Sequence, residues 1–314
     1  MAVRKYDLVM THGLDTDGAF LHRVQERCAA AGLDFFLIEP LWAEAFLKAL
    51  DAGTVLPRTL INLHSEHHDP QDVFSRLVDR AEALGVRMID PPSVARACFD
   101  KAAMHHRLIA AGIHVPPTIL LPAEAAARWT PTREESSLLG SPFVVKPSLG
   151  YGRRGVVLDA MDVEDVARSM AAWPDRCLLL QRRIIPRMLG DQPAYFRVYY
   201  IFGRIWCCWW NCFNDLYREV TPEELVTLRL SPLREITLEI ARLTGMGMFS
   251  TEITLSDAGR FVVIDYVNDQ IHMLTQSSNP AIGVPDAVVL GIADALVDVV
   301  SGRSVVPVAE EDPA

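Results

Sequence analysis

Four short apolar runs alternate with helical stretches over the first part of the chain. The runs cover residues 7–10, 34–39, 59–63 and 86–89. Amphipathic stretches such as residues 43–50 and 73–84 lie between them. Short apolar runs separated by helices are typical of a parallel α/β layer, because each helix returns the chain to the start of the next strand. The alternation therefore predicts an α/β domain that ends near Pro91 and Pro92.

A lysine directly precedes a glycine-rich loop in the segment FVVKPSLGYGRRG, at residues 143–155. Residues 143–145 read as a buried strand, so Lys146 leaves the sheet at its edge, where an ammonium can bind phosphate. The loop glycines permit close approach of the backbone to a ligand, and they are Gly150, Gly152 and Gly155. The segment contains neither a Walker A loop nor a dinucleotide fingerprint. It predicts a nucleotide-phosphate site, with a surface turn and a solvated lysine as the alternative.

Residues 248–269 contain two strand-like runs joined by Ser-Asp-Ala-Gly-Arg, which predicts a β-hairpin. A four-residue turn would pair Ser256 with Phe261. In that register Glu252 faces Asp265, and two like charges that face each other are destabilising. A cation between them would relieve the repulsion, and Mg²⁺ prefers carboxylates together with nucleotide phosphates. The alternative is a register shifted by one residue, which moves the two carboxylates to opposite faces.

The order of these segments resembles the ATP-grasp superfamily, which includes D-alanine:D-alanine ligase, glutathione synthetase and ribosomal-protein glutamate ligases. The resemblance covers about residues 95–300 and implies an α/β architecture, an ATP-grasp fold with an N-terminal Rossmann-like pre-ATP-grasp domain. The expected division is an N-terminal domain at 1–94, a central lobe with the phosphate loop at 95–175, a C-terminal lobe with the metal site at 176–302, and a disordered tail at 303–314.

The resemblance also implies which residues bind the nucleotide. Lys101 opens the helical segment FDKAAMHHRLIAAGIHVPPT and would begin the nucleotide-binding unit. Lys146 matches the strand lysine that contacts the phosphates. Gln181 and the following backbone would meet adenine. The cofactor-binding set for ATP is therefore Lys101, Lys146, Ser148, Gly150, Gly152, Gly155, Gln181 and Ile184.

Glu252, Asp265 and Asn268 fall where the family places its ligands for Mg²⁺ or Mn²⁺. The last two are three residues apart, whereas the family spacing is two. Either the strand bulges there, or Asp269 replaces Asn268 as the second ligand. The metal set is thus implied by the resemblance, and its last member stays open.

Three arginines complete the site that the resemblance implies. Arg197, in the segment YFRVYY, matches an arginine near the phosphates or the acyl group. Arg153 and Arg154 of the glycine loop would offset charge on the transferred phosphoryl group. Arg182 and Arg183, by contrast, stand where the family usually has an acid that binds ribose, so ribose binding is unassigned.

The activity implied by the resemblance is that of an ATP-dependent carboxylate–amine ligase. Such an enzyme forms an amide or peptide bond through an acylphosphate and releases ADP and phosphate. Its partners would be small-molecule or peptide carboxylates and amines, and the chain could form a homodimer. Two alternatives stay open: an ATP-grasp protein that stops at phosphoryl transfer or carboxylation, and a nucleotide-binding regulator without turnover.

Charge and cysteine content narrow the class of protein. The chain has 314 residues, a formal charge of −10 and a pI near 5.4, which argue against nucleic acid or an anionic membrane surface as the main partner. No leader opens the sequence and no apolar run approaches a membrane span, so we expect a cytoplasmic protein. The six cysteines have no CxxC spacing, which indicates buried free thiols.

Two histidine-bearing segments are weaker candidates. His64, His67 and His68 could bind a metal or border the acceptor substrate, but a solvated loop is the more ordinary interpretation. Residues 12–18 follow the first strand, where open α/β sheets bind ligands. A helix N-cap by Asp15 or Asp17 explains that segment equally well.

Five aromatic residues crowd the segment IWCCWWNCFNDLY: Trp206, Trp209, Trp210, Phe213 and Tyr217. Packing in the core is the default interpretation of such a cluster. An exposed tryptophan face beside Arg197 would instead suit an apolar or aromatic acyl substrate.

Overall fold

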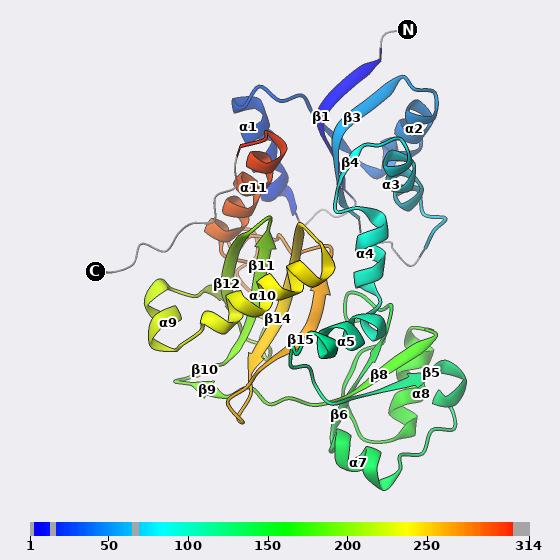
Figure 1. Cartoon of the computed structure of the whole chain (residues 1–314), viewed down its shortest axis with the longest axis vertical. Helices are drawn as coiled ribbons and strands as arrows, with labels where there is room; N and C mark the ends of the chain where they lie inside the picture. The colour runs from blue at the N-terminus through cyan, green and yellow to red at the C-terminus, as the bar shows by residue number, and fades with distance from the viewer. Residues whose placement is uncertain (1–2, 13–16, 65–68, 304–314) are drawn as a thin grey trace. The chain divides into compact units, whose positions relative to one another are not determined.

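The computed structural model describes residues 3–12, 17–64 and 69–303 (Figure 1). His67, His68 and Asp15 lie outside the described residues, as does the predicted tail beyond Arg303. The chain divides into two compact units, each assembled from separate stretches. Unit 1 comprises Met1–Arg96, Phe196–Ser250 and Asn268–Ala314, and unit 2 comprises Ala97–Tyr195 and Thr251–Val267. The three sequential lobes expected above stay a prediction.

The first sheet of unit 1 is parallel, with strand order β2-β1-β3-β4. Its strands are β1 (Arg4–His12), β2 (Phe35–Ile38), β3 (Val55–Leu63) and β4 (Arg87–Ile89). The helices that follow them are α1 (Gly18–Ala30), α2 (Pro40–Asp51), α3 (Val73–Ala83) and α4 (Pro92–Phe99). All four strands expected in this region are present, so the predicted parallel α/β layer is confirmed.

Local signals in the sequence explain where these helices begin. Pro40 occupies the first turn of α2, where its missing N–H costs nothing. The carboxylate of Asp72 caps α3 by accepting the N–H groups of Phe74 at 2.8 Å and Ser75 at 3.0 Å.

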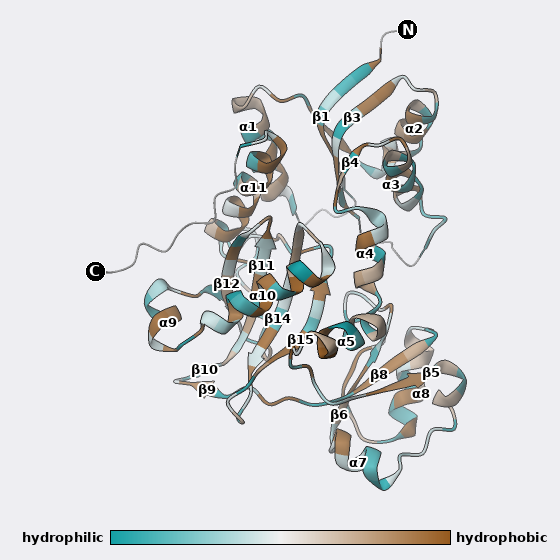
Figure 2. Ribbon diagram, in the orientation of Figure 1, coloured by the Kyte–Doolittle hydropathy of each residue, from teal (hydrophilic) through white to brown (hydrophobic). Residues whose placement is uncertain are grey.

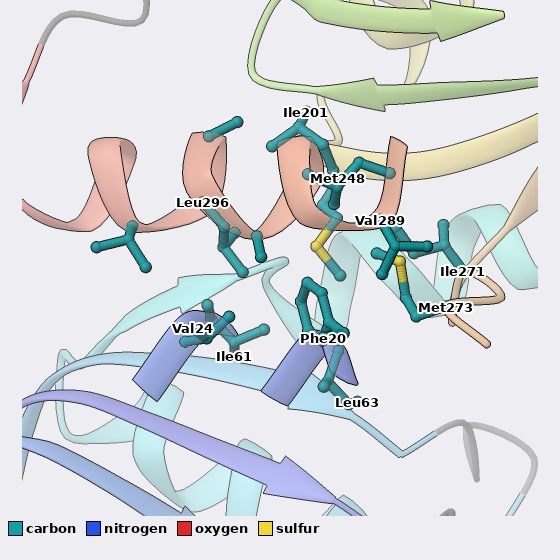
Figure 3. Close-up of a cluster of buried hydrophobic side chains, with 14 of the residues drawn as sticks. Phe20, Val24, Ile61, Leu63, Ile201, Met248, Ile271, Met273, Val289 and Leu296 are labelled. Carbon is teal, nitrogen blue, oxygen red and sulfur yellow. The ribbon is translucent and has the colours of Figure 1, made fainter. Parts of the chain in front are cut away.

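Unit 1 also contains α11 (Asp286–Val300), which is apolar on most of its surface. It packs with α1, the first sheet and three later strands, β11 (Tyr195–Ile201), β12 (Arg204–Trp210) and β14 (Met248–Leu255), into one hydrophobic cluster (Figure 3). Ten of its side chains are labelled in that view: Phe20, Val24, Ile61, Leu63, Ile201, Met248, Ile271, Met273, Val289 and Leu296. The helix near the end of the chain therefore completes the core of the first domain.

Ion pairs line the contact between α1 and α11. Arg23 holds the carboxylate of Asp294 through two bonds, of 2.7 Å and 2.9 Å. One turn later Asp298 accepts from Arg27 at 3.3 Å and from Arg204 at 3.2 Å. The side chain of Asp298 is only 17% exposed, so its charge depends on these arginines.

A five-stranded sheet has the order β13-β12-β11-β14-β15. Its strands are β11 (Tyr195–Ile201), β12 (Arg204–Trp210), β13 (Tyr217–Glu219), β14 (Met248–Leu255) and β15 (Phe261–Asn268). Two helices, α9 (Pro222–Thr227) and α10 (Ser231–Thr244), separate β13 from β14. Most of β14 and β15 belongs to unit 2, whereas β12 and β13 belong to unit 1.

The other sheet of unit 2 is antiparallel, with order β5-β8-β6-β7. Its strands are β5 (Thr118–Pro122), β6 (Phe143–Pro147), β7 (Val157–Ala160) and β8 (Cys177–Arg182). The helices of this unit are α5 (Lys101–Ala110), α6 (Ala123–Ala126), α7 (Arg133–Leu139) and α8 (Val163–Ala172). A small ribbon of β9 (Met188–Leu189) and β10 (Gln192–Pro193) follows β8. Figure 2 colours the hydrophobic residues of these strands brown, and their buried side chains form the core of the unit.

The turn between β14 and β15 differs from the expected one. Ser256 donates its N–H to the carbonyl of Arg260 at 2.9 Å, and Gly259 donates back to Ser256 at 2.8 Å. Ser256 therefore faces Arg260 rather than Phe261. Gly259 has φ +75°, and a left-handed glycine closes a three-residue turn with a bulge. The four-residue turn expected from the sequence is wrong by one residue.

The corrected turn changes the partners along the hairpin. Continued along the two strands, it sets Asp265 opposite Thr251 instead of Glu252. The Thr251 hydroxyl does donate to the Asp265 carbonyl, at 3.0 Å. The expectation that Glu252 and Asp265 face each other directly is therefore wrong, and their repulsion has to be judged from their actual surroundings.

All six cysteines are free thiols, as expected; four are buried, while Cys177 and Cys212 are half-buried. Burial raises the pKa of the Cys28 thiol to about 11. Among the described residues, none of the helices combines the length and the apolar composition that a membrane span requires.

Asp298→Asn should lower the free energy of unfolding by about 1–2 kcal/mol, because Arg27 and Arg204 lose a charged acceptor at a largely buried position. The matched control is Asp51→Asn. Asp51 pairs with Arg80 at 2.7 Å, but its side chain is 56% exposed. We expect the control to change stability by less than about 0.5 kcal/mol. Urea unfolding followed by tryptophan fluorescence measures both variants, and equal losses would contradict the structural role given to Asp298.

Candidate functional site

Lys146 lies near the end of β6, where it meets the hairpin of β14 and β15. Its ammonium donates to the carbonyl of Ile264 on β15 at 3.0 Å. Burial lowers the pKa of Lys146, the charges of Asp265 and Glu252 raise it, and Lys101 lowers it, with a net lowering. Each of these groups acts on Lys146 only because it lies close by. Unit 2 therefore gathers two lysines and two carboxylates at one place.

The two carboxylates have different surroundings. Glu252 is only 7% exposed, and one of its oxygens accepts the hydroxyl of Tyr195 at 2.9 Å. Asp265 is half-buried on β15. Both carboxylates act on Lys146, but in the register set by the turn they belong to opposite faces of the hairpin, which is the alternative that the sequence left open. A cation directly between them is therefore no longer required.

Carboxylate oxygens are suitable ligands for Mg²⁺, which usually takes one or two of them together with phosphates and water. Glu252 and Asp265 fit that requirement only if phosphate oxygens complete the set. Asn268 ends β15 in unit 1, and its amide nitrogen donates to the Ser250 carbonyl at 3.4 Å. Within the described part of the chain, no three residues of the types His, Cys, Asp and Glu are grouped as a metal centre. The metal role of all three residues stays a prediction.

The base of the glycine loop is tied to the start of α5. Asp100 caps this helix by accepting the N–H groups of Ala102 and Ala103, at 3.1 Å and 3.2 Å. The same carboxylate accepts the Ser148 hydroxyl at 2.6 Å and pairs with Arg176. The pKa of Asp100 is lowered: burial acts to raise it, but Ser148, Ala103 and Arg176 together outweigh burial.

Ser148 differs from its predicted role as a nucleotide ligand. The residue is fully buried, and its oxygen also accepts the N–H of Ala102 at 3.0 Å. Its carbonyl accepts the N–H of Lys101 at 3.0 Å. Ser148 therefore anchors the base of the loop, and its role toward the nucleotide stays a prediction.

The Lys101 ammonium donates to the Gly150 carbonyl at 2.5 Å, so this side chain reaches into the glycine loop. Gly155 has φ +70°, and a Cβ there would lie 2.7 Å from both Pro147 and Trp173. A glycine at this position is required by the packing of the loop itself. Gly152, by contrast, has open space around it. Turn geometry explains both glycines, since Gly152 also has a left-handed backbone, with φ +57°. Gly152 in addition has open space through which a ligand can approach the backbone.

The two loop arginines differ in their positions. Arg154 lies over the rings of Tyr151 and Trp173, with its guanidinium carbon 4.9 Å and 5.5 Å from their centroids. It also donates to the Tyr151 hydroxyl at 3.0 Å. Arg153 is exposed. Arg154 is therefore held against the loop in this structure, and the catalytic role of both arginines stays a prediction.

Gln181 is the second residue whose predicted role differs from the structure. Its side chain is 2% exposed and donates to the Tyr266 hydroxyl at 3.0 Å and to Thr118 at 3.1 Å. The Tyr266 hydroxyl also bonds to Nδ1 of His105 at 2.7 Å. Burial, with a smaller effect of the neighbouring His106, lowers the pKa of His105 to about 4. The Gln181 side chain therefore belongs to an internal polar network. The predicted contact with adenine would have to come from the backbone that follows, at the half-buried Ile184.

The arginines that replace the expected ribose-binding acid are also engaged. Arg182 donates to the carbonyls of Leu138 and Ser137, each at 2.7 Å. Arg183 pairs with Asp159. Sequence reasoning did not single out Tyr195, Tyr266 or Asp100 as part of the site. The only available signal was the position of polar residues within or beside otherwise apolar strands.

Arg197 lies on β11 in unit 1, opposite Cys208 of β12. Its guanidinium carbon lies 5.2 Å from the centroid of the Trp210 ring. Unit 1 therefore carries the third arginine of the predicted site, whereas the lysines and the two carboxylates belong to unit 2.

No protein-family model matches this chain, and no curated protein matches it either. Solved structures do. One is the ATP-grasp ligase PsnB in complex with a minimal precursor, Mg and ADP, with a TM-score of 0.62, 16% identity, and coverage of 95% of this chain and 99% of that one. The RimK-domain ATP-grasp protein from Sphaerobacter thermophilus has a TM-score of 0.60 and 18% identity, covering 92% of this chain and 99% of that one.

A third similar structure is D-alanine–D-alanine ligase from Bacillus anthracis in complex with ATP. It has a TM-score of 0.61 and 15% identity, and covers 96% of this chain and 100% of that one. These matches run through both compact units and the parallel first sheet. The predicted fold is therefore confirmed: the chain has the α/β ATP-grasp fold, with a Rossmann-like domain at its N-terminus.

Proposed function

We propose that this protein is an ATP-dependent carboxylate–amine ligase, which forms an amide or peptide bond and releases ADP and phosphate. The observation that carries the proposal is the group of Lys101, Lys146, Glu252 and Asp265 beside the anchored glycine loop. Two ammonium groups and two carboxylates in a partly buried place suit a polyphosphate with its metal ion. The solved structures of the same fold, which include ligases with bound ATP, ADP or AMPPNP, support this assignment.

Each residue has a physical task in this reaction. Lys101 and Lys146 neutralise phosphate charge, and Gly152 lets the loop backbone approach the nucleotide. Glu252 and Asp265, with Asn268 as the proposed third ligand, would hold Mg²⁺ or Mn²⁺. When bound, such an ion would neutralise part of the phosphate charge. Arg197, with Arg153 or Arg154, would offset charge on the transferred phosphoryl group.

The chemistry takes two steps. A carboxylate oxygen of the substrate forms a bond to the γ-phosphorus while the bond to the bridging oxygen of ADP breaks. The amine then bonds to the acyl carbon. The bond between the acyl carbon and the phosphate oxygen breaks, phosphate leaves with that electron pair, and the nitrogen loses a proton. No nucleophilic side chain is required. This agrees with the buried state of most cysteine thiols.

The substrates are proposed as a small-molecule or peptide carboxylate and an amine. The similar PsnB structures contain a precursor peptide, which supports a peptide as one of the two. The acidic charge of −10 agrees with partners other than nucleic acid or membrane. A homodimer and a cytoplasmic location stay predictions.

One observation favours a nucleotide-binding regulator without turnover. Arg182 and Arg183 replace the acid that would bind ribose, and both are engaged with other groups of unit 2. A screen of carboxylate and amine pairs for ADP release, with hydroxylamine to trap an acylphosphate, separates the candidates. Hydroxamate supports the ligase, ADP without hydroxamate supports simple phosphoryl transfer, and tight ATP binding without ADP supports the regulator.

Lys146→Met should weaken MgATP binding by about 10- to 100-fold, because a charged hydrogen bond to phosphate is lost while the volume of the side chain is kept. Lys48→Met is the matched control, since Lys48 is exposed on α2 in unit 1. Isothermal titration calorimetry measures both variants. Unchanged affinity in Lys146→Met would remove the central residue of the proposed site.

Asp265→Asn should abolish metal-dependent turnover, because one of the two carboxylates is lost. It should also lower the stability of the metal-free protein slightly, since Asp265 has a larger stabilising effect on the Lys146 ammonium than Glu252 has. Steady-state ADP release against Mg²⁺ concentration, together with thermal unfolding, tests both parts. Turnover at the wild-type rate with the same Mg²⁺ midpoint would show that the metal site lies elsewhere.

The third metal ligand is tested by a pair of variants, Asn268→Ala and Asp269→Ala. Asp269 lies near Asp90, and its charge contributes to the pKa of Asp90, which burial raises to about 7. Asn268 is the last residue of β15, the strand that carries Asp265, whereas Asp269 lies beyond the end of that strand. We therefore expect the Mg²⁺ midpoint to rise in Asn268→Ala and to stay unchanged in Asp269→Ala; the reverse result would assign the metal to Asp269.

A further inference from the structure

The parallel sheet of unit 1 has one edge whose outer backbone groups are unpaired. β2 is the outermost strand on that side, and within the described part of the chain it pairs with β1 alone. The Asp34 carbonyl, directly before β2, accepts the N–H groups of Asp7 at 2.9 Å and Leu8 at 3.2 Å, so it faces β1. Since the backbone groups of successive strand residues point in alternate directions, those of Phe35 and Leu37 face away from β1. Among the described residues, no hydrogen bond reaches these outward groups.

A groove with a volume of about 400 Å³ follows this edge. It is lined by Gly18, Leu21, His22 and Gln25 of α1 and by residues 35–37 of β2. The groove exists because α11 packs on the other side of α1. Arg23 and Arg27 of α1 bind acids of α11, and at 100° per residue the groove-lining residues lie on the opposite side of the α1 helix. The space over the β2 edge therefore stays open.

Both faces of the sheet beside this edge are apolar. Helices α1 and α11 lie on one side of the sheet, and α2 and α3 lie on the other (Figure 1). Phe35 and Leu37 pack against the cluster that contains α1, whereas Phe36 packs against the cluster that contains α2 and α3. A strand added next to β2 would alternate its side chains between the same two faces. Those on the α1 side would enter the groove, whose volume is in the range of ligand sites.

An exposed acid stands at each end of the edge. Asp34 directly precedes β2, and Glu39 directly follows it. In the part of the chain that the structure describes, neither carboxylate has a hydrogen-bond or ion-pair partner. Along an extended chain they are about 16 Å apart, so a strand with a Lys or Arg at both ends of a six-residue segment matches them.

The same two acids disfavour a second copy of this chain as the occupant. If two β2 strands paired antiparallel, Asp34 of one copy would lie next to Glu39 of the other at both ends of the pair. Like charges across paired strands are destabilising. Charge complementarity therefore favours a basic peptide over self-association.

We propose that the β2 edge binds an extended peptide segment of another protein, which adds to the sheet as a fifth strand. The segment has a basic residue at each end and, between them, two apolar residues separated by one, which enter the groove. It runs antiparallel to β2, because antiparallel pairing is the more stable per residue. Bonds to the backbone of Phe35 and Leu37 supply affinity, and the groove and the two acids supply the sequence preference. The inference goes beyond the proposed ligase function, since this edge takes no part in the phosphate chemistry.

The hexapeptide Lys-Thr-Leu-Thr-Leu-Lys, labelled with fluorescein at its N-terminus and amidated at its C-terminus, tests the backbone pairing. In the proposed register its lysines face Glu39 and Asp34, and its leucines face Leu37 and Phe35. Fluorescence anisotropy with the full-length protein should show saturable binding. N-methylation of both leucines should abolish it, because their N–H groups donate to β2. N-methylation of both threonines, whose N–H groups point away, should change the affinity by less than about 3-fold.

Reversing the two charges tests the location. Asp34→Lys/Glu39→Lys should weaken binding of the lysine peptide by about 5- to 30-fold and create binding of Glu-Thr-Leu-Thr-Leu-Glu. The matched control is Glu223→Lys/Glu235→Lys, which changes the net charge equally at two exposed acids of α9 and α10. This control should keep the wild-type preference for the lysine peptide.

Three outcomes would overturn the inference. Equal affinity for the leucine-methylated and threonine-methylated peptides would show that the edge backbone does not hold the peptide. Equal effects of the two double variants would show only a general attraction to an acidic protein. A wild-type protein that sediments as a dimer and does not bind the peptide would assign the edge to a second copy. None of these measurements depends on ATP turnover, so each leaves the proposed ligase function untouched.

Discussion

The charge balance around Lys146 is the constraint on which the candidate site depends. A buried ammonium loses hydration, and here two carboxylates and the Ile264 carbonyl replace it. The same ammonium interacts with acids from both strands of one hairpin. Any phosphate that enters this place meets an ammonium already fixed by the protein, so little reorganisation is needed to bind it.

The base of the glycine loop is held by a few side chains that each make several bonds. One carboxylate, Asp100, caps a helix, holds Ser148 and pairs with an arginine, so the start of α5 and the base of the loop form one piece. Lys101 joins the same piece through Gly150. The loop is therefore rigid where it leaves the strand and has open space only at Gly152. In the proposed function, the tip of such a loop can approach a nucleotide while Lys101 and Lys146, which would bind the phosphates, stay in place.

The sequence was sufficient for the fold, whereas the roles of the site residues stay predictions. Alternating apolar runs predicted the parallel sheet, and the order of motifs predicted the ATP-grasp fold. The hairpin register was missed because residues 256–260 suit two turn lengths, and only the left-handed Gly259 decides between them. Ser148 and Gln181 were assigned to the ligand because a pattern shows where a polar side chain stands, but not whether it points inward. Core packing, the default interpretation of the tryptophan segment, agrees with Trp209 and Trp210, which are only 3% and 7% exposed.

The ion pairs between α1 and α11 join residues that are 271 positions apart in the chain. The apolar face of α1 that contains Phe20 and Val24 is covered by α11, a helix that the ribosome makes much later than α1. At about 5–20 residues per second, synthesis of the intervening chain takes on the order of tens of seconds. During that time the N-terminal domain has its sheet but lacks its cover. Completion of this core therefore has to wait for α11, and until then the nascent chain presents an apolar surface that other chains or chaperones can reach.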